Sequence, residues 1–337
     1  MKRFVTFGEL LLSLSSSGNS RLVQSDFFNA QYVGAEANVA VSMAHFGVEA
    51  YEVSKVPAHE IGQACVNALR RYGVRTEYIL RGGDRLGILY KEIGASQRPI
   101  KVIYDRKHTA IKQIEPGELD WDAIMAGKDW FHLSGSSLAL GQEIVDAVVP
   151  AIAAAKRAGA TVSCDCNYRS KLWSRQEAGR ALASLMENID VFICGRDDPH
   201  DIFGIPRERL GDLTGAARDQ RSAELLQERF NLQCVAFTFR EGISASVNAL
   251  SAMFCRDGKA YVSPRYEMQI VDRVGGGDAF AAGLIYSLMS DYDPQHIINF
   301  ATAAAVLKHS IPGDCNLVSV EEVEQLVTGG QSGRVQR

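Results

Sequence analysis

Two hydrophobic patterns of different period alternate along the chain from about residue 121 onward. Short, almost continuously apolar runs are typical of strands buried on both faces, and they lie at residues 130–133, 161–166, 191–194 and 234–239. Between these runs are longer segments with the apolar spacing of helices, at residues 142–158, 175–187 and 217–230. The alternation predicts β-α-β units and therefore a parallel sheet with helices on both faces.

Elements of the same kind are expected on either side of this region. They are strands at 4–7 and 49–53, helices at 38–46, 61–72, 294–308 and 320–327, and a hairpin at 250–255 and 260–263. Two stretches, residues 10–33 and 86–114, interrupt the pattern. One mixes short apolar runs with serines, the other reads as a hairpin, and together they predict a small separate sheet. We therefore expect an α/β domain of residues 1–9, 34–85 and 115–327, a discontinuous β lid of residues 10–33 and 86–114 with a possible dimer surface, and a flexible tail of residues 328–337.

The most distinctive stretch is residues 271–289. Gly275, Gly276 and Gly277 directly precede Asp278, and residues 279–289 are apolar on nearly every face, which predicts a buried helix. Unpaired N–H groups at such a helix start form an anion site, and the glycines allow another molecule to approach closely. A carboxylate beside these donors suits a general base. The alternative is an ordinary tight turn with Asp278 as the N-cap.

Composition narrows the classes of function. Lys and Arg number 36 against 40 Asp and Glu, a formal net charge of −4, which gives no support to nucleic-acid or membrane-surface binding. Seven cysteines, an odd number, fit free thiols and a cytoplasmic protein better than disulfides. We therefore expect a small-molecule partner. In a parallel sheet it would bind at the carboxyl ends of the strands, where polar residues such as Asp165, Asn167 and Arg169 follow the apolar runs.

Two motifs make the chain similar to the ribokinase-like (PfkB) carbohydrate kinases over essentially its whole length. Residues 272–278, DRVGGGD, match the late D-x-x-G-x-G-D signature of that family, and residues 34–40, GAEANVA, match its early glycine-rich signature. The resemblance implies a Rossmann-like three-layer αβα fold with a mainly parallel central sheet and a small β-sheet lid. It also implies an ATP-dependent sugar kinase that uses Mg²⁺, and an oligomer of identical chains, a dimer or larger.

The resemblance assigns roles to residues of this chain. Asp278 would be the base and the N–H groups of Gly275, Gly276 and Gly277 the anion hole, while Asp272 and the carbonyl of Val274 would hold a monovalent cation such as K⁺. The expected nucleotide-binding residues are Asp198, Thr238, Arg240, Gly242, Gly275, Gly277, Gly313 and Asn316. Because phosphoryl transfer has a loose transition state, positioning and charge stabilisation would dominate the catalysis.

Within the family, the sugar-acid branch that phosphorylates 2-keto-3-deoxygluconate is the most similar. The residues expected to bind the sugar acid are Gly34, Asn38, Tyr90, Tyr104, Arg106 and Arg169. Arginines can pair with a carboxylate, whereas a neutral sugar would give them no partner. The alternatives are aromatic packing for the tyrosines and solvated surface charges for the arginines.

Three positions depart from the family pattern. Gly195 stands where an asparagine is usual, Arg240 in a turn that usually contains glycine, and Arg273 where threonine is common. These changes bear on nucleotide and metal binding more than on the base. Two other functions therefore stay open: a kinase of a neutral sugar, of the fructokinase or ribokinase type, and a sugar-binding homologue with impaired catalysis.

Overall fold

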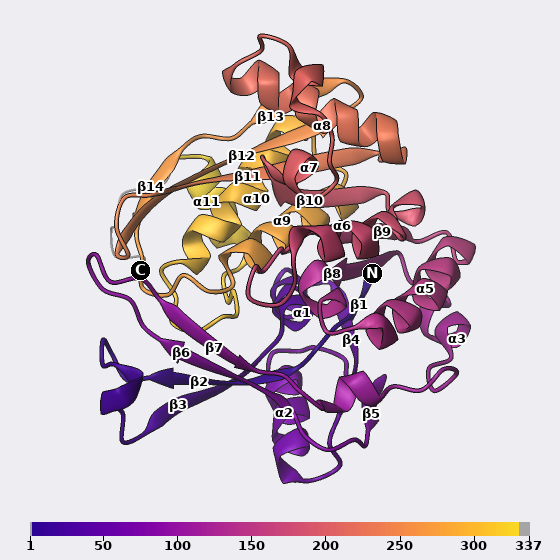
Figure 1. Ribbon diagram of the computed structural model, residues 1–337, viewed down its shortest axis with the longest axis vertical. Coiled ribbons are helices and arrows are strands. Elements are labelled where there is room, and N and C mark those ends of the chain that lie inside the picture. Colours follow the sequence, from indigo (N-terminus) through magenta and orange to yellow (C-terminus); the bar gives the residue numbers. More distant parts are fainter. Residues whose placement is uncertain (1, 330–337) are drawn as a thin grey trace.

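The apolar runs of the sequence are neighbouring strands of one large sheet in a computed structural model, which describes residues 2–329 (Figure 1). The strand order is β13-β12-β11-β10-β9-β8-β1-β4-β5, and β14 also pairs with β12. The strands are β1 (Arg3–Phe7), β4 (Glu49–Val56), β5 (Ile79–Arg81), β8 (Trp130–Ser134), β9 (Thr161–Asp165), β10 (Val191–Gly195), β11 (Cys234–Gly242), β12 (Val247–Arg256), β13 (Lys259–Val262) and β14 (Tyr266–Gln269). Pairing is parallel from β5 to β11 and antiparallel for β12, β13 and β14.

Helices cover both faces of this sheet, because each strand sends alternate side chains to opposite faces. Val5 and Phe7 of β1 belong to one buried cluster and Phe4 to the other. The first cluster packs under α3 (Trp121–Met125), α4 (Gly135–Leu138), α5 (Gln142–Arg157), α6 (Arg175–Ala183), α7 (Asp198–Asp201) and α8 (Gly215–Phe230). The second packs under α1 (Ala35–His45), α2 (Glu60–Arg71), α9 (Gly276–Met289), α10 (Pro294–Lys308) and α11 (Val320–Val327). The three layers confirm the predicted αβα class.

A separate four-stranded sheet extends from the body at the lower left of Figure 1. Its order is β3-β2-β6-β7, with β2 (Leu11–Ser16), β3 (Phe28–Val33), β6 (Gly87–Glu92) and β7 (Lys101–Asp105). These strands come from the two stretches that we placed in the lid, and we call this sheet the lid. One boundary of that prediction is wrong: Ala110 and Ile111 are buried, and Ile111 packs in the core of the body because its side chain is apolar. Of the predicted tail, residues 330–337 lie outside the described residues.

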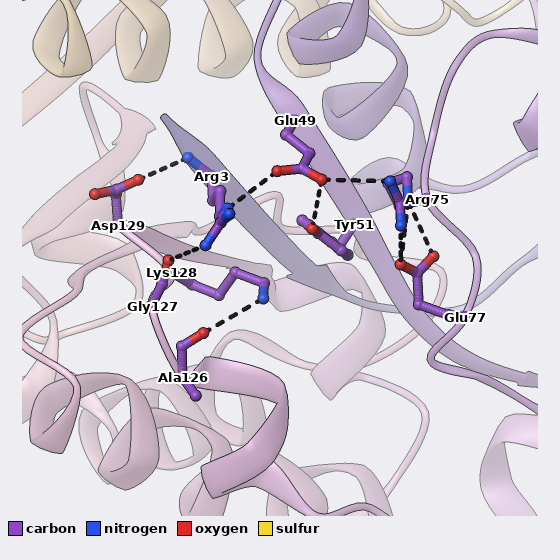
Figure 2. Close-up of polar contacts among 9 residues, drawn as sticks. All are labelled: Arg3, Glu49, Tyr51, Arg75, Glu77, Ala126, Gly127, Lys128 and Asp129. Carbon is purple, nitrogen blue, oxygen red and sulfur yellow. Dashed lines mark hydrogen bonds and ion pairs between the residues drawn. The ribbon is translucent and has the colours of Figure 1, made fainter. Parts of the chain in front are cut away.

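The amino edge of the large sheet carries an exposed network of ion pairs (Figure 2). Arg3 pairs with Glu49 at 3.0 Å, and Arg75 bridges Glu49 and Glu77 at 3.4 and 2.8 Å. Exposed pairs of this kind contribute little to stability. The network lies at the edge opposite the polar strand ends, so it plays no part in the candidate site. Among residues 2–329, no helix is both long and apolar enough to span a bilayer.

Candidate active site

The glycine turn before α9 presents Asp278 to the centre of the molecule. Gly275 is the N-cap of the helix and has φ 85°, a left-handed conformation that favours glycine. Asp278 is the third residue of the helix, so its interpretation as an ordinary N-cap is wrong. Its carboxylate is buried and accepts a hydrogen bond of 2.7 Å from the side-chain amide of Asn38, in α1. The two family signatures, 240 residues apart, therefore meet at one hydrogen bond.

The three glycines of the turn are needed for different reasons. A Cβ on Gly275 would lie 1.8 Å from the carbonyl oxygen of Asp314, and one on Gly276 would lie 2.4 Å from the ring of His309. A Cβ on Gly277 would meet nothing within 4 Å. Gly275 and Gly276 thus allow the turn to pack against the chain, while Gly277 leaves open space beside a helix N-terminus. This open position is where an anionic group can approach the backbone N–H groups.

Burial raises the pKa of Asp278 to about 6, and Asp314 adds to this effect. The hydrogen bond from Asn38 and the positive charge of Arg169 act in the opposite direction. A carboxylate with this pKa is still mostly ionised at neutral pH, and it is a stronger base than an exposed aspartate. The site therefore gives Asp278 the protonation state and the basicity that proton abstraction from a hydroxyl requires.

A cleft of about 610 Å³ opens in front of the turn, at the carboxyl ends of β9, β10 and β11. Arg169, Arg240 and Arg273 all line it, and among the described residues none of them has a carboxylate partner. The pKa of Arg240 is lowered to about 10, first by desolvation within the cleft and next by the positive charges of Arg273 and Arg169. Three arginines without carboxylate partners among the described residues thus line one cleft, which suits the binding of a polyanion.

Two further carboxylates face the same cleft. The pKa of Asp165 is raised to about 7 by burial and then by Asp278, and burial also raises the pKa of Asp198. Asp198 accepts a hydrogen bond of 2.7 Å from the backbone N–H of Gly195, so it also shapes the turn after β10. Mg²⁺ prefers oxygen ligands such as carboxylates, and neither of these two forms an ion pair among the described residues, so the residues present fit this ion. Sequence analysis placed Asp198 among the nucleotide-binding residues and named Asp165 only as a polar residue at a strand end.

A smaller cavity of about 80 Å³ continues from the cleft towards the lid, and Asp278 lines both. Of the residues predicted to bind the sugar acid, Gly34, Asn38, Tyr104, Arg106 and Arg169 line this cavity. Arg106 is buried and forms an ion pair with Glu9, whereas Arg169 is exposed and has no carboxylate partner among the described residues. Arg169 is therefore the guanidinium whose charge is free for a ligand. The buried residues Glu9 and Glu36 also line the cavity, and sequence analysis assigned neither of them a role.

Tyr90 does not line either cavity. It contacts Phe28 on the opposite face of the lid, while its neighbour Leu89 lines both cavities and pairs in register with Tyr104. Because side chains alternate between the faces of a sheet, a difference of one residue reverses the face. The assignment of Tyr90 to the sugar is therefore wrong for this chain, and an apolar Leu89 occupies the position next to Tyr104.

The predicted nucleotide-binding residues divide into two groups. Asp198, Thr238, Arg240, Gly275 and Gly277 line the cleft, whereas Gly242, Gly313 and Asn316 do not. Gly242 lies at the far end of β11, opposite Asn248. Gly313 packs against Gln31 of the lid, since a Cβ there would lie 2.7 Å from the amide nitrogen, and Asn316 is buried. The loop after α10 thus faces the lid in this structure, and nucleotide contacts of these three residues stay a prediction.

The position predicted for a monovalent cation is already filled by a side chain of the lid. The Nζ atom of Lys91 lies 2.9 Å from Oδ2 of Asp272, which also accepts a hydrogen bond from the backbone N–H of Gly313, while Oδ1 accepts one from the N–H of Val274. A cation bound to Asp272 does not fit these contacts, so that prediction is wrong. Lys91 was missed, although it shares a strand face with Leu89 and its period-2 spacing could have indicated this.

Comparison with known proteins agrees with the geometry. Residues 1–320 match the model of the pfkB family carbohydrate kinases. The chain belongs to the pfkB family. It is 44% identical to the 2-dehydro-3-deoxygluconokinase of Thermotoga maritima, with a TM-score of 0.94 over 98% of this chain and 100% of that one. A pfkB family carbohydrate kinase of Listeria grayi is 34% identical, with a TM-score of 0.91 over 97% of this chain and 100% of that one. The 2-dehydro-3-deoxygalactonokinase of Haloferax volcanii is 31% identical over 98% of both chains.

Family membership confirms the predicted enzyme class, a carbohydrate kinase, and the ribokinase-like fold. The similarity to the pfkB family relatives covers both the body and the lid, since it extends over nearly the whole of each chain. It does not test which residues of this chain contact a ligand. The roles of individual residues therefore depend on the geometry described above.

Proposed function

We propose that this chain transfers the γ-phosphoryl group of ATP to the terminal hydroxyl of a sugar acid. The acceptor would be 2-keto-3-deoxygluconate and the product 2-keto-3-deoxy-6-phosphogluconate. The observation that supports this most directly is the position of Asp278, which lines both the large cleft and the small cavity. A base at this junction can take a proton from a hydroxyl in the cavity while a phosphate lies in the cleft.

The polyanion that fits the cleft is a nucleoside triphosphate. Arg240 and Arg273 would neutralise its phosphates, and the exposed turn at Gly277 would present backbone N–H groups to the transferred phosphoryl group. Mg²⁺, when bound, would neutralise part of the phosphate charge, with Asp165 and Asp198 as carboxylate donors. Asn38 would hold the carboxylate of the base in position through its hydrogen bond.

The choice of a sugar acid rests on Arg169, which lines the small cavity without a carboxylate partner among the described residues. A substrate carboxylate would pair with this guanidinium, and Tyr104 lines the same cavity. A relative of this chain is named for the galactonate form of the substrate, the C4 epimer. The second candidate acceptor is therefore 2-keto-3-deoxygalactonate.

The test is ATP consumption by the purified chain with both sugar acids and with fructose. The sugar acids should be preferred, and Arg169→Ala should raise KM for them by roughly 10-fold or more, as loss of a charge-assisted pair would. Arg157→Ala is the matched control, because Arg157 is exposed on α5 and pairs with Asp122 away from the site. A preference for fructose, or an unchanged KM in Arg169→Ala, would contradict the sugar-acid assignment. Calorimetry that finds sugar binding without ATP binding would point to an impaired homologue.

The predicted homo-oligomer is kept as a proposal, with the outer face of the lid as its interface. Phe28, Tyr90 and Ile103 lie on this face, and Phe28 and Ile103 are 38% and 46% exposed. A second copy of this chain can cover the face because two identical apolar faces are self-complementary. Light scattering should find a dimer or larger oligomer that Ile103→Glu dissociates, and a monomeric wild type would refute the proposal. A cytoplasmic location stays a prediction.

A further inference from the structure

Lys91 is a lysine of the lid that reaches into the body beneath the glycine turn. Its side chain is buried, and its Nζ lies 2.9 Å from Asp272 and 2.8 Å from Asp314. Desolvation opposes the charge of this lysine, but the two carboxylates outweigh it and raise the pKa, so Lys91 is protonated at neutral pH. The buried ammonium and its two buried carboxylate partners depend on one another, because each of the three charges would be costly to bury alone.

A second buried lysine lies beside the same two carboxylates. Lys308, at the end of α10, is also buried and its Nζ donates a hydrogen bond of 3.0 Å to the backbone carbonyl of Asp272. Two ammonium groups therefore face two carboxylates, those of Asp272 and Asp314. Asp278 also interacts electrostatically with Lys308 and Asp314, and Lys91 brings its positive charge to the point where the monovalent cation was predicted.

The two carboxylates that Lys91 joins both control the glycine turn. Asp272 accepts a hydrogen bond of 3.1 Å from the N–H of Val274, directly before Gly275. The carbonyl of Asp314 packs so closely on Gly275 that no Cβ would fit between them. Lys91 therefore connects Asp272, which binds the residue before the glycine turn, with Asp314, whose carbonyl packs against Gly275. The N–H groups of this turn face the cleft. If this ammonium were absent, two buried carboxylates would repel each other beside the turn.

We propose that Lys91 is a positioning residue that does the work of a bound monovalent cation, so that phosphoryl transfer by this chain needs no K⁺. The proposal rests on the kinase function proposed above. The lid supplies the charge, and the glycine turn therefore has its catalytic geometry only when the lid strand β6 lies against Asp272 and Asp314. Lys91 touches neither substrate in this scheme and acts through the position of the turn.

The first experiment compares wild-type kinase rates in KCl, NaCl and tetramethylammonium chloride at equal ionic strength. The rates should not depend on the choice of salt. The second experiment uses Lys91→Met, which keeps the length of the side chain but removes the charge. Its kcat should fall by roughly 10–100-fold while the KM of the sugar changes little, and KCl or NH₄Cl should restore activity where tetramethylammonium does not. Lys91→Arg should stay independent of the salt.

A matched control separates this role from the general cost of losing a buried lysine. Lys55 is also buried, with its Nζ 2.7 Å from Glu118, but it lies outside both cavities. Lys55→Met should lose stability without acquiring a dependence on K⁺. Activation of the wild type by K⁺ relative to tetramethylammonium would overturn the proposal, and this measurement needs no variant to fold. A folded Lys91→Met with wild-type kcat in tetramethylammonium would also overturn it.

The same salts are used to measure the rise in melting temperature that ATP causes. This readout keeps the proposal testable if the sugar has been misassigned, because it needs no acceptor. ATP should stabilise the wild type equally in every salt, and it should stabilise Lys91→Met more in KCl than in tetramethylammonium. A K⁺-dependent shift in the wild type would count against Lys91, whereas a missing kinase rate in every salt would count against the proposed function alone.

Discussion

Replacing Asp278 by asparagine should have opposite effects on activity and stability. The substitution removes the base and keeps the size of the side chain and an acceptor for Asn38, which lies 2.7 Å away. Loss of a positioned general base lowers kcat by about 10²-fold or more. Because the wild-type carboxylate is buried with a raised pKa, its removal also relieves the folded state of an unfavourable charge.

The size of the stability effect follows from the pKa shift. The pKa of Asp278 rises from 3.8 to about 6 on folding, mainly through burial. Each pKa unit corresponds to about 1.4 kcal/mol, so ionisation costs the folded protein up to about 3 kcal/mol at high pH. The sign is fixed by the direction of the shift: the cost is fully present above the folded pKa and fades as the pH falls from about 6 to about 4. Below that range the carboxyl is protonated in both states.

The assay is urea unfolding of the wild type and Asp278→Asn, without nucleotide or Mg²⁺, at about pH 8 and about pH 5. The variant should be the more stable protein at the higher pH, and its advantage should shrink at the lower one. The kcat of the wild type should in turn fall as the pH drops through about 6. A variant less stable than the wild type at about pH 8, or an advantage that does not change with pH, would refute the environment assigned to Asp278.

Four further substitutions test the site and its surroundings. Gly277→Ala should fold normally, since its Cβ meets nothing within 4 Å, but should lower kcat/KM for ATP by roughly 10-fold or more, whereas Gly275→Ala should destabilise the fold in a melting experiment. Asn38→Ala removes a hydrogen bond that lowers the pKa of Asp278, so the acid side of the kcat profile should move to higher pH. Glu49→Gln, in the exposed network of Figure 2, should change the unfolding free energy by less than about 1 kcal/mol and leave the kinetics unaltered.

The elements of the body could be predicted because their hydrophobic periods are long and regular. The helix expected at 294–308 is α10 with the same bounds, and the glycine turn does precede a buried helix. Two short strands, β5 and β14, were not predicted. They contain three and four residues, which is too few for a period to be recognised, and β14 pairs only at the antiparallel edge of the sheet.

The parts of the site that sequence could not supply depend on contacts between distant segments. The motifs placed Asp278 and Asn38, but the pKa of Asp278 depends on the burial of the folded protein. Tyr90 was assigned to the sugar acid, but the register with Tyr104 and the lining of the cavity show that its neighbour Leu89 faces the cavity. The strand face of Lys91 could have been inferred from its spacing to Leu89, but its contact with Asp272 could not, because the two residues are 181 positions apart.

The lid and the glycine turn are connected by charge in a way that gives the lid two tasks. Tyr104 and Leu89 line the sugar cavity, and Lys91, two residues further along the same strand face, completes the support of the turn. One movement of β6 would therefore enclose the acceptor and set the anion hole together. An enzyme built this way would have its phosphoryl-transfer geometry only when the lid covers the sugar cavity. Transfer of the phosphoryl group to water, and thus wasteful hydrolysis of ATP, would be reduced.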